Sequence, residues 1–161
     1  MRVGGSRSRL HLEIDLARKN LKRDQIDLFQ LHRVDPNVDI EVSIEALAEA
    51  KEQGKIRHIG LSNISKEQLQ RAMRIVPIAS VQNRFNQAER AEQELVDFTA
   101  ERGIAFIPYG PLGAHPMRPG AKLPPREAIA WLLQRSPNII VIPGTTSIEN
   151  LRDNIHAWEL L

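Results

Sequence analysis

Five short apolar runs alternate with longer amphipathic segments along this chain, and the alternation constrains the fold more than any other feature. The apolar runs are bounded by polar residues, glycine or proline, as buried strands are, and they cover residues 26–32, 56–63, 78–83, 104–109 and 139–142. The segments with the spacing or the end signals of helices cover residues 10–21, 38–54, 66–74, 87–103, 124–135 and 148–158. The sequence therefore predicts an α/β fold with about five parallel strands, spaced as in the units of a partial (β/α)8 TIM barrel.

Length and composition exclude several classes of protein. The 161 residues suit a single domain over residues 1–161, with the basic, small residues 1–9 as a loop or disordered segment. Lysine plus arginine number 22 and aspartate plus glutamate 20, so no nucleic acid or membrane partner is expected. The chain has no cysteine, which fits a cytoplasmic location, and its five histidines are too scattered to form a metal site. No apolar run approaches the roughly 20 residues of a membrane helix.

Polar residues or a tyrosine stand at the carboxyl ends of the predicted strands, where a barrel carries its catalytic face. These residues are His32, Ser62, Asn63, Gln82, Tyr109 and, after the fifth run, Gly144, Thr145, Thr146 and Ser147. Amides can hold a carboxamide, a tyrosine ring can stack on a heterocycle, a helix start can bind phosphate, and a histidine can orient or protonate a carbonyl oxygen. Taken singly, each segment is more often structural, as a strand end or a helix cap. Their recurrence at successive strand ends favours a binding or catalytic site.

Five motifs in a fixed order resemble the C-terminal part of the aldo-keto reductases, in the form found in bacterial members. They are IDLFQLH at 26–32, IRHIGLSN at 56–63, VQNRFN at 81–86, IPYGPLG at 107–113, and IPGTTS at 142–147 with NLRDN at 150–154. The likeness covers almost the whole chain from about residue 10. It implies strands 4 to 8 of a (β/α)8 barrel. It also implies an NADP(H)-dependent oxidoreductase that reduces aldehydes or ketones to alcohols.

The resemblance implies a role for each matched residue. His32 matches the catalytic histidine that helps to orient a small carbonyl substrate. The matches to cofactor contacts are Ser62, Asn63 and Gln82 for the nicotinamide carboxamide, Tyr109 for stacking on its ring, Gly110, Pro111 and Leu112 for the pyrophosphate path, Gly144, Thr145, Thr146 and Ser147 for the 2′-phosphate segment, and Asp153 and Asn154 for adenine. NADPH is the implied cofactor. NADH remains possible, because Asn150 stands where many members have an arginine.

Two departures from the family pattern concern catalysis and closure of the barrel. The family also uses an aspartate, a tyrosine proton donor and a lysine from its first three barrel units, and Tyr109 is the only tyrosine here. Five strands cannot close an eight-stranded barrel, so the runs 26–32 and 139–142 would be open edges that invite pairing with another chain. We therefore expect a truncated reductase with little or no turnover alone, whose open edges take a complementing N-terminal half or a second copy. The alternative is a non-catalytic nucleotide-binding or self-associating module.

Overall fold

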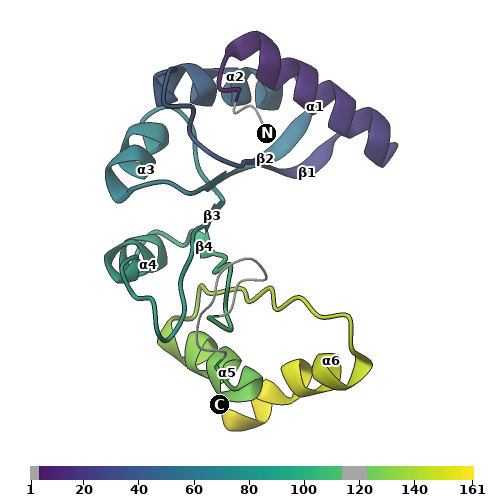
Figure 1. The fold of residues 1–161 in the computed structure, drawn as a ribbon. Helices are drawn as coiled ribbons and strands as arrows, with labels where there is room; N and C mark the ends of the chain where they lie inside the picture. The colour runs from purple at the N-terminus through teal and green to yellow at the C-terminus, as the bar shows by residue number, and fades with distance from the viewer. Residues whose placement is uncertain (1–3, 114–122) are drawn as a thin grey trace. The chain divides into compact units, whose positions relative to one another are not determined.

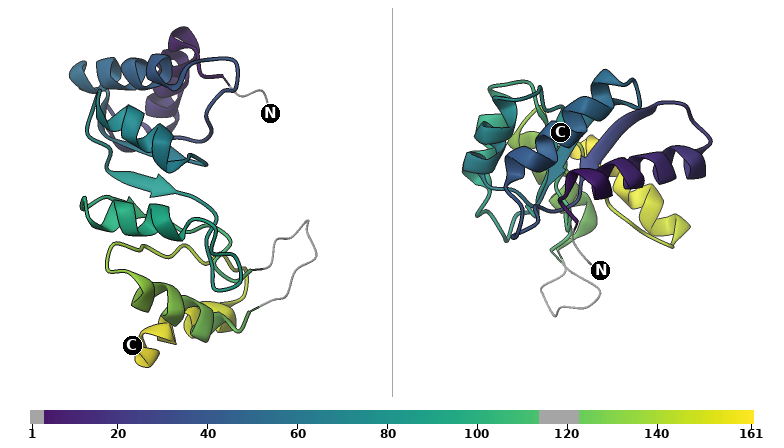
Figure 2. Two further views of the ribbon diagram at one scale, coloured as in Figure 1. Left: turned by 90° about the vertical axis from the view of Figure 1, so that its left-hand side faces the viewer. Right: turned by 90° about the horizontal axis from the view of Figure 1, so that it is seen from above.

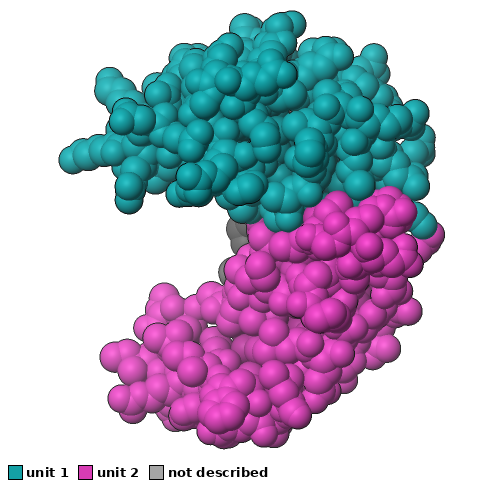
Figure 3. Space-filling view, turned by 180° about the vertical axis from the view of Figure 1, so that it is seen from behind, with its two compact units in different colours: residues 1–81 teal, residues 82–161 magenta. Residues whose placement is uncertain are grey.

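The computed structural model describes residues 4–113 and 123–161 of the chain (Figures 1 and 2). The chain divides into two compact units, Met1–Val81 and Gln82–Leu161, which Figure 3 colours separately. The prediction of a single domain is not tested by this division and stays a prediction. Four strands alternate with helices along the described residues, which confirms the predicted α/β class.

Over its described residues, the first unit holds three helices and three strands. In chain order these are α1 (Arg7–Leu21), β1 (Ile26–Leu31), α2 (Ile40–Glu52), β2 (Ile56–Ser62), α3 (Lys66–Met73) and β3 (Ser80–Gln82), whose last residue opens the second unit. Strands β1 and β2 pair in parallel, from Ile26 opposite Ile56 to Leu31 opposite Leu61. The helices lie on one side of this pair in Figure 1, and α1 packs along α2. The fully buried residues of this core include Ile14, Ile44, Leu47, Ile59, Leu61 and Leu69.

The start of α3 follows directly from its sequence. The side chain of Ser65 accepts a hydrogen bond from the Gln68 amide over 3.1 Å, and Gln68 Oε1 accepts one from the Ser65 amide over 2.9 Å. This reciprocal capping box satisfies two amides that the first helical turn leaves without partners. It begins the helix at Lys66, where the predicted segment 66–74 also begins, and fixes where the chain turns after β2.

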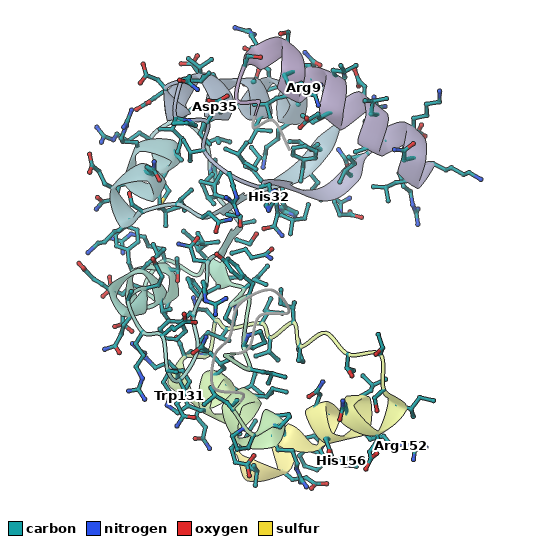
Figure 4. All side chains as sticks on the ribbon, in the orientation of Figure 1. Arg9, His32, Asp35, Trp131, Arg152 and His156 are labelled. Carbon is teal, nitrogen blue, oxygen red and sulfur yellow. The ribbon has the colours of Figure 1, made fainter. Side chains whose placement is uncertain are left out.

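The second unit is built around a small aromatic cluster. Its further elements are α4 (Gln93–Ala100), β4 (Ala105–Phe106), α5 (Pro125–Arg135), α6 (Ile148–Ile155) and the 3-10 helix η1 (His156–Leu160). The ring of Phe85 meets Phe106 edge-on at 6.0 Å between centroids and lies 5.6 Å from the ring of Trp131, which Figure 4 labels on α5. These contacts fasten the segment after β3 to β4 and to α5.

The predicted strand over 139–142 is wrong. Its place is taken by a single parallel bridge between Phe106 and Ile139, with hydrogen bonds of 2.9 Å from the Phe106 amide to the Asn138 carbonyl and from the Ile140 amide to the Phe106 carbonyl. Ile140 and Ile142 are 54% and 43% exposed. Strand β4 is only two residues long, so the pairing of this segment with it stops after one bridge.

Other predicted boundaries also differ. Residues 7–9, assigned to a loop, form the first turn of α1, so that part of the assignment is wrong. Residues 1–3 of the predicted N-terminal loop, and residues 114–122, lie outside the described residues. The helix expected from residue 87 begins at Gln93, and the run 104–109 keeps only two residues as strand β4. No helix in the described ranges combines the length and the apolar character that crossing a membrane requires.

Candidate cofactor and substrate site

The first unit brings three of the predicted residues together. His32 directly follows β1 (Figure 4), Ser62 ends β2 and Asn63 follows it. The side-chain amide of Asn63 donates hydrogen bonds of 3.0 Å to the backbone carbonyl of His32 and to Ser62 Oγ. His32 is exposed, whereas Ser62 is 4% exposed. The parallel register places both strand ends at the same edge, so the sequence prediction of a shared rim is confirmed for these residues.

Asn63 has an uncommon backbone conformation that suits this role. Its φ is +55°, in the left-handed region that asparagine tolerates better than most residues. The left-handed turn aims the amide back across the edge of the strand pair at the His32 carbonyl. One residue therefore both ends β2 and holds the chain that follows β1.

A second polar layer lies one pleat below His32 and was not identified from the sequence. Gln30 on β1 faces Gly60 on β2, and a Cβ built on Gly60 would lie 2.8 Å from Gln30 Cγ and 2.4 Å from Ser80 Oγ. The Gln30 side chain therefore lies over β2 beside Ser80. Gln30 Oε1 and Ser80 Oγ are buried and make no hydrogen bond among the described residues. The sequence could have revealed Gln30, because it lies two residues before His32 and side chains two residues apart on a strand share a face.

The loop that carries the chain away from His32 is fastened by a carboxylate. Asp35, labelled in Figure 4, is 8% exposed and accepts hydrogen bonds from the amides of Asn37 over 3.0 Å and Gly5 over 3.1 Å. These bonds, first that from Asn37 and then that from Gly5, hold the pKa of the Asp35 carboxyl below its usual value. Ser43 adds a hydrogen bond of 2.8 Å to the Gly5 carbonyl. The N-terminal segment is thereby tied to the loop after His32.

The second unit holds the predicted ring-stacking residue on a bridge. Tyr109 pairs with Arg84 in a parallel bridge. The Tyr109 amide donates a hydrogen bond to the Asn83 carbonyl over 3.1 Å, and the Tyr109 carbonyl accepts one from the Phe85 amide over 3.4 Å. Its side chain is half-buried, and so is that of Gln82, the last residue of β3. The backbone of Tyr109 is therefore fixed on both sides by the segment that continues β3.

The segment Gly110, Pro111, Leu112 and Gly113 follows Tyr109 as a tight turn. The Gly113 amide donates to the Gly110 carbonyl over 3.1 Å, and Gly110 has a φ of +65°. The fully buried Asn86 donates to the Gly110 carbonyl over 3.0 Å, and Arg84 donates to the Gly113 carbonyl over 3.2 Å. Sequence reasoning assigned no role to either side chain, since both act on a loop more than twenty residues further along the chain.

The adenosine-side segment begins at the start of α6. Ser147 caps this helix by accepting from the Asn150 amide over 3.3 Å, and Thr145 Oγ1 accepts from the Ser147 amide over 3.1 Å. Gly144, Thr145 and Thr146 are exposed, and a Cβ on Gly144 would have nothing within 4 Å. The backbone here is open to an approaching group, so these residues fit a phosphate.

The two predicted adenine contacts have different surroundings. Asp153 on α6 is exposed, whereas Asn154 is 8% exposed and its Oδ1 is buried without a hydrogen-bond partner among the described residues. Asp153 is thus available to a ligand, and Asn154 has an unused acceptor. Their roles stay predictions. No cluster of three histidine, cysteine, aspartate or glutamate residues suited to a metal occurs in the described ranges.

The fold and the site residues define an α/β protein with parallel strands, in which polar residues stand at the ends of β1, β2 and β3. Comparison with known proteins makes this class specific. The family model described as the aldo/keto reductase family matches residues 1–127. The chain therefore belongs to the aldo/keto reductase family, a family of oxidoreductases, which confirms the resemblance found in the sequence.

Relatives of known sequence and structure agree with this assignment. The chain is 44% identical over 131 residues to pyridoxine 4-dehydrogenase of Escherichia coli, a match that covers 75% of this chain and 46% of that enzyme. It is 36% identical over 159 residues to an uncharacterized oxidoreductase of Schizosaccharomyces pombe, covering 92% of this chain and 52% of that protein. A thermostable aldo-keto reductase crystallised with epalrestat superposes with a TM-score of 0.80 at 26% identity, over 96% of this chain and 62% of its own. The chain thus spans about half the length of the curated relatives that it matches.

Proposed function

We propose that this chain forms the cofactor-binding part of an NAD(P)H-dependent reductase of aldehydes or ketones. NADPH is the proposed cofactor, with NADH as the alternative. The observation that carries the proposal is the hydrogen bond from Asn63 to the carbonyl of His32, because it unites two predicted site residues at the ends of paired strands. The cytoplasmic location favoured by the cysteine-free composition belongs to the same proposal.

The proposed roles follow from the chemistry of the side chains. Ser62, Asn63 and Gln82 offer hydroxyl and amide groups that can hold a carboxamide through donor and acceptor pairs. The half-buried ring of Tyr109 offers a face for stacking. His32, exposed at the rim, would hold the oxygen of a carbonyl substrate. The nicotinamide, when bound, supplies the hydride, and these residues orient it and the substrate.

The phosphates would meet backbone and hydroxyl groups. Gly110, Pro111 and Leu112 would line the pyrophosphate path beside Tyr109. The open backbone at Gly144 and the hydroxyls of Thr145, Thr146 and Ser147 would receive the adenosine 2′-phosphate, with Asp153 and Asn154 at adenine. The space at Gly144 and the exposure of Asp153 support this assignment.

Proton donation to the substrate needs a group other than the residues proposed above for cofactor and substrate binding. The single tyrosine, Tyr109, is assigned to stacking, so we propose that a complementing N-terminal half supplies the aspartate, tyrosine and lysine that the resemblance implies. Exposed leucines on the first unit support such a contact. They are Leu12, Leu16 and Leu21 on α1 and Leu28 on the edge strand β1, between 39% and 59% exposed.

The same exposed leucines favour a second candidate, a nucleotide-binding module that associates with itself. An open apolar edge strand is a template for pairing with a second copy. Under this alternative the chain binds cofactor without turnover. The oligomeric state separates the two candidates, because a self-associating module forms a discrete dimer without any other chain.

The test is a fluorescence titration of the purified chain with NADPH and then with NADH, with a sizing column run on the same sample. The proposal predicts that the fluorescence changes saturably as cofactor is added, with one cofactor site per chain. Nicotinamide-free 2′,5′-ADP should compete, because it carries the adenosine half of the ligand. A fluorescence change that does not saturate with added NADPH or NADH, measured on a chain that elutes as a defined species, contradicts the proposal.

A further inference from the structure

Arg84 belongs to a motif that the proposed function leaves partly unused. It lies two residues after β3, and its backbone forms the bridge to Tyr109. Its side chain is 24% exposed and is engaged on two sides. The Nε atom donates to Glu89 Oε2 over 2.6 Å, and Nη2 donates to the Gly113 carbonyl over 3.2 Å. The guanidinium thus links a nearby carboxylate to the far end of the turn that follows Tyr109.

The turn has a glycine where the guanidinium passes. A Cβ built on Gly110 would lie 3.0 Å from Arg84 Nη1 and 3.4 Å from Cζ, and the φ of +65° disfavours any side chain. Gly110 therefore lets the planar guanidinium lie close over the backbone. Such a close approach orients the fork toward the Gly113 carbonyl.

Glu89 and Asn86 hold the guanidinium and the turn from the other side. Asn86 donates to Glu89 Oε2 over 2.8 Å and to the Gly110 carbonyl over 3.0 Å. Its Oδ1 accepts from the amides of Ala88 and Glu89 over 2.9 Å each. The carboxylate of Glu89 thus receives both Arg84 and Asn86, and these two side chains reach the two ends of one turn.

We propose that Arg84 is a positioning residue that holds the turn from Gly110 to Gly113 in the shape that receives the cofactor pyrophosphate. The inference rests on the proposed cofactor function of this turn and adds the side chain that sets its geometry. Arg84 acts through the Gly113 carbonyl and does not itself touch the phosphates. Its planar fork is essential, because one guanidinium must serve Glu89 and Gly113 from different nitrogens.

A simpler role for Arg84 is charge pairing with Glu89, and the two roles differ in what lysine can do. Arg84→Lys keeps the positive charge and can still meet Glu89, but a single ammonium lacks the fork that also reaches Gly113. If pairing is the role, lysine restores wild-type behaviour. If positioning is the role, Arg84→Lys and Arg84→Met behave alike.

The experiment measures hydrogen exchange of the Gly113 amide in the cofactor-free chain and NADPH affinity by fluorescence, in Arg84→Met, Arg84→Lys and the control Arg102→Met. Arg102 lies in the same unit, pairs with Glu101 and donates to the Phe98 carbonyl, so the control also removes one charge and its hydrogen bonds. The Gly113 amide reports on the turn because it donates to Gly110. The Ala128 amide, which donates to the Pro124 carbonyl at the start of α5, shows that the unit stays folded.

The proposal predicts that both Arg84 variants exchange Gly113 about tenfold faster and bind NADPH about tenfold more weakly, since a lost charge-assisted hydrogen bond has that scale. Arg102→Met should leave both values unchanged. Unchanged Gly113 exchange in Arg84→Met, or full recovery in Arg84→Lys, overturns the proposal. A wild-type chain that binds no NADPH would contradict the proposed function, and the exchange result would still decide whether Arg84 holds the turn.

Discussion

The Asn63 side chain holds the backbone carbonyl of His32 across the ends of two parallel strands, over 3.0 Å, while its own backbone adopts a φ of +55°. The catalytic histidine assigned by the resemblance is therefore positioned through its main chain. This arrangement leaves the imidazole exposed at the rim. The rim thus depends on one residue for both a turn and a hydrogen bond.

Two variants separate the two contributions of Asn63. Asn63→Gly keeps the left-handed turn but loses the amide, so it should lower the free energy of unfolding by about 1–3 kcal/mol, the scale of the two hydrogen bonds that the amide donates. Asn63→Ala also strains the turn and should cost about 1 kcal/mol more. Urea unfolding of both variants measures these values. The interpretation fails if alanine proves as stable as glycine.

Gly60 should resist even the smallest side chain. In Gly60→Ala the new Cβ would lie 2.4 Å from Ser80 Oγ and 2.8 Å from Gln30 Cγ, so one of these side chains must move. We expect a loss of about 1–3 kcal/mol in the free energy of unfolding, as for overpacked interiors. Gly144→Ala is the matched control, because its Cβ would meet nothing within 4 Å. Thermal melts that show equal effects for the two variants would contradict the close packing over β2.

Asp35 predicts a defined pH dependence of stability. Its folded pKa is lowered by the hydrogen bonds from Asn37 and Gly5, so the folded chain binds the proton less readily than the unfolded chain does. The contribution of Asp35 to the free energy of unfolding is therefore present above the unfolded pKa of about 3.9, and it disappears as the pH falls through the lower folded pKa. Asp35→Asn should be less stable than wild type at pH 7, and the gap in melting temperature should close in acid. A difference in melting temperature that widens below pH 4 would contradict a lowered pKa of Asp35 in the folded chain.

Tyr109 tests the cofactor assignment in the second unit. Replacing the ring by Tyr109→Ala should weaken NADPH binding by about 1–3 kcal/mol, the scale of aromatic stacking. Tyr109→Phe keeps the ring and should bind nearly as well as wild type. Fluorescence titrations of the three proteins provide the comparison. Equal affinities for alanine and wild type would remove Tyr109 from the nicotinamide site.

Sequence patterns predicted the first unit well because its signals are local. The apolar run at 26–32 became β1 with a difference of one residue, and the helix predicted over 66–74 became α3 with the same difference. The aldo-keto reductase family was identifiable because its motifs lie at the strand ends. Each of these signals acts through neighbours close in the chain.

Patterns failed where structure depends on distant partners. The run 139–142 is apolar enough for a strand, but its pairing in the described unit stops after the bridge at Ile139. A local turn was missed as well: the helix predicted from residue 87 starts late because Asn86 accepts hydrogen bonds from the amides of Ala88 and Glu89. The role of Arg84 was hidden too, because the Gly113 carbonyl that it contacts lies on a loop distant in the chain.

The central claim is that this chain binds a nicotinamide cofactor at the assigned residues. The most direct test follows backbone amide resonances of the chain during a titration with NADPH. The account predicts that the resonances of Ser62, Asn63, Tyr109 and Gly144 shift and saturate together, with one apparent affinity. Shifts that do not saturate, or that are confined to the exposed leucines of α1, would contradict it.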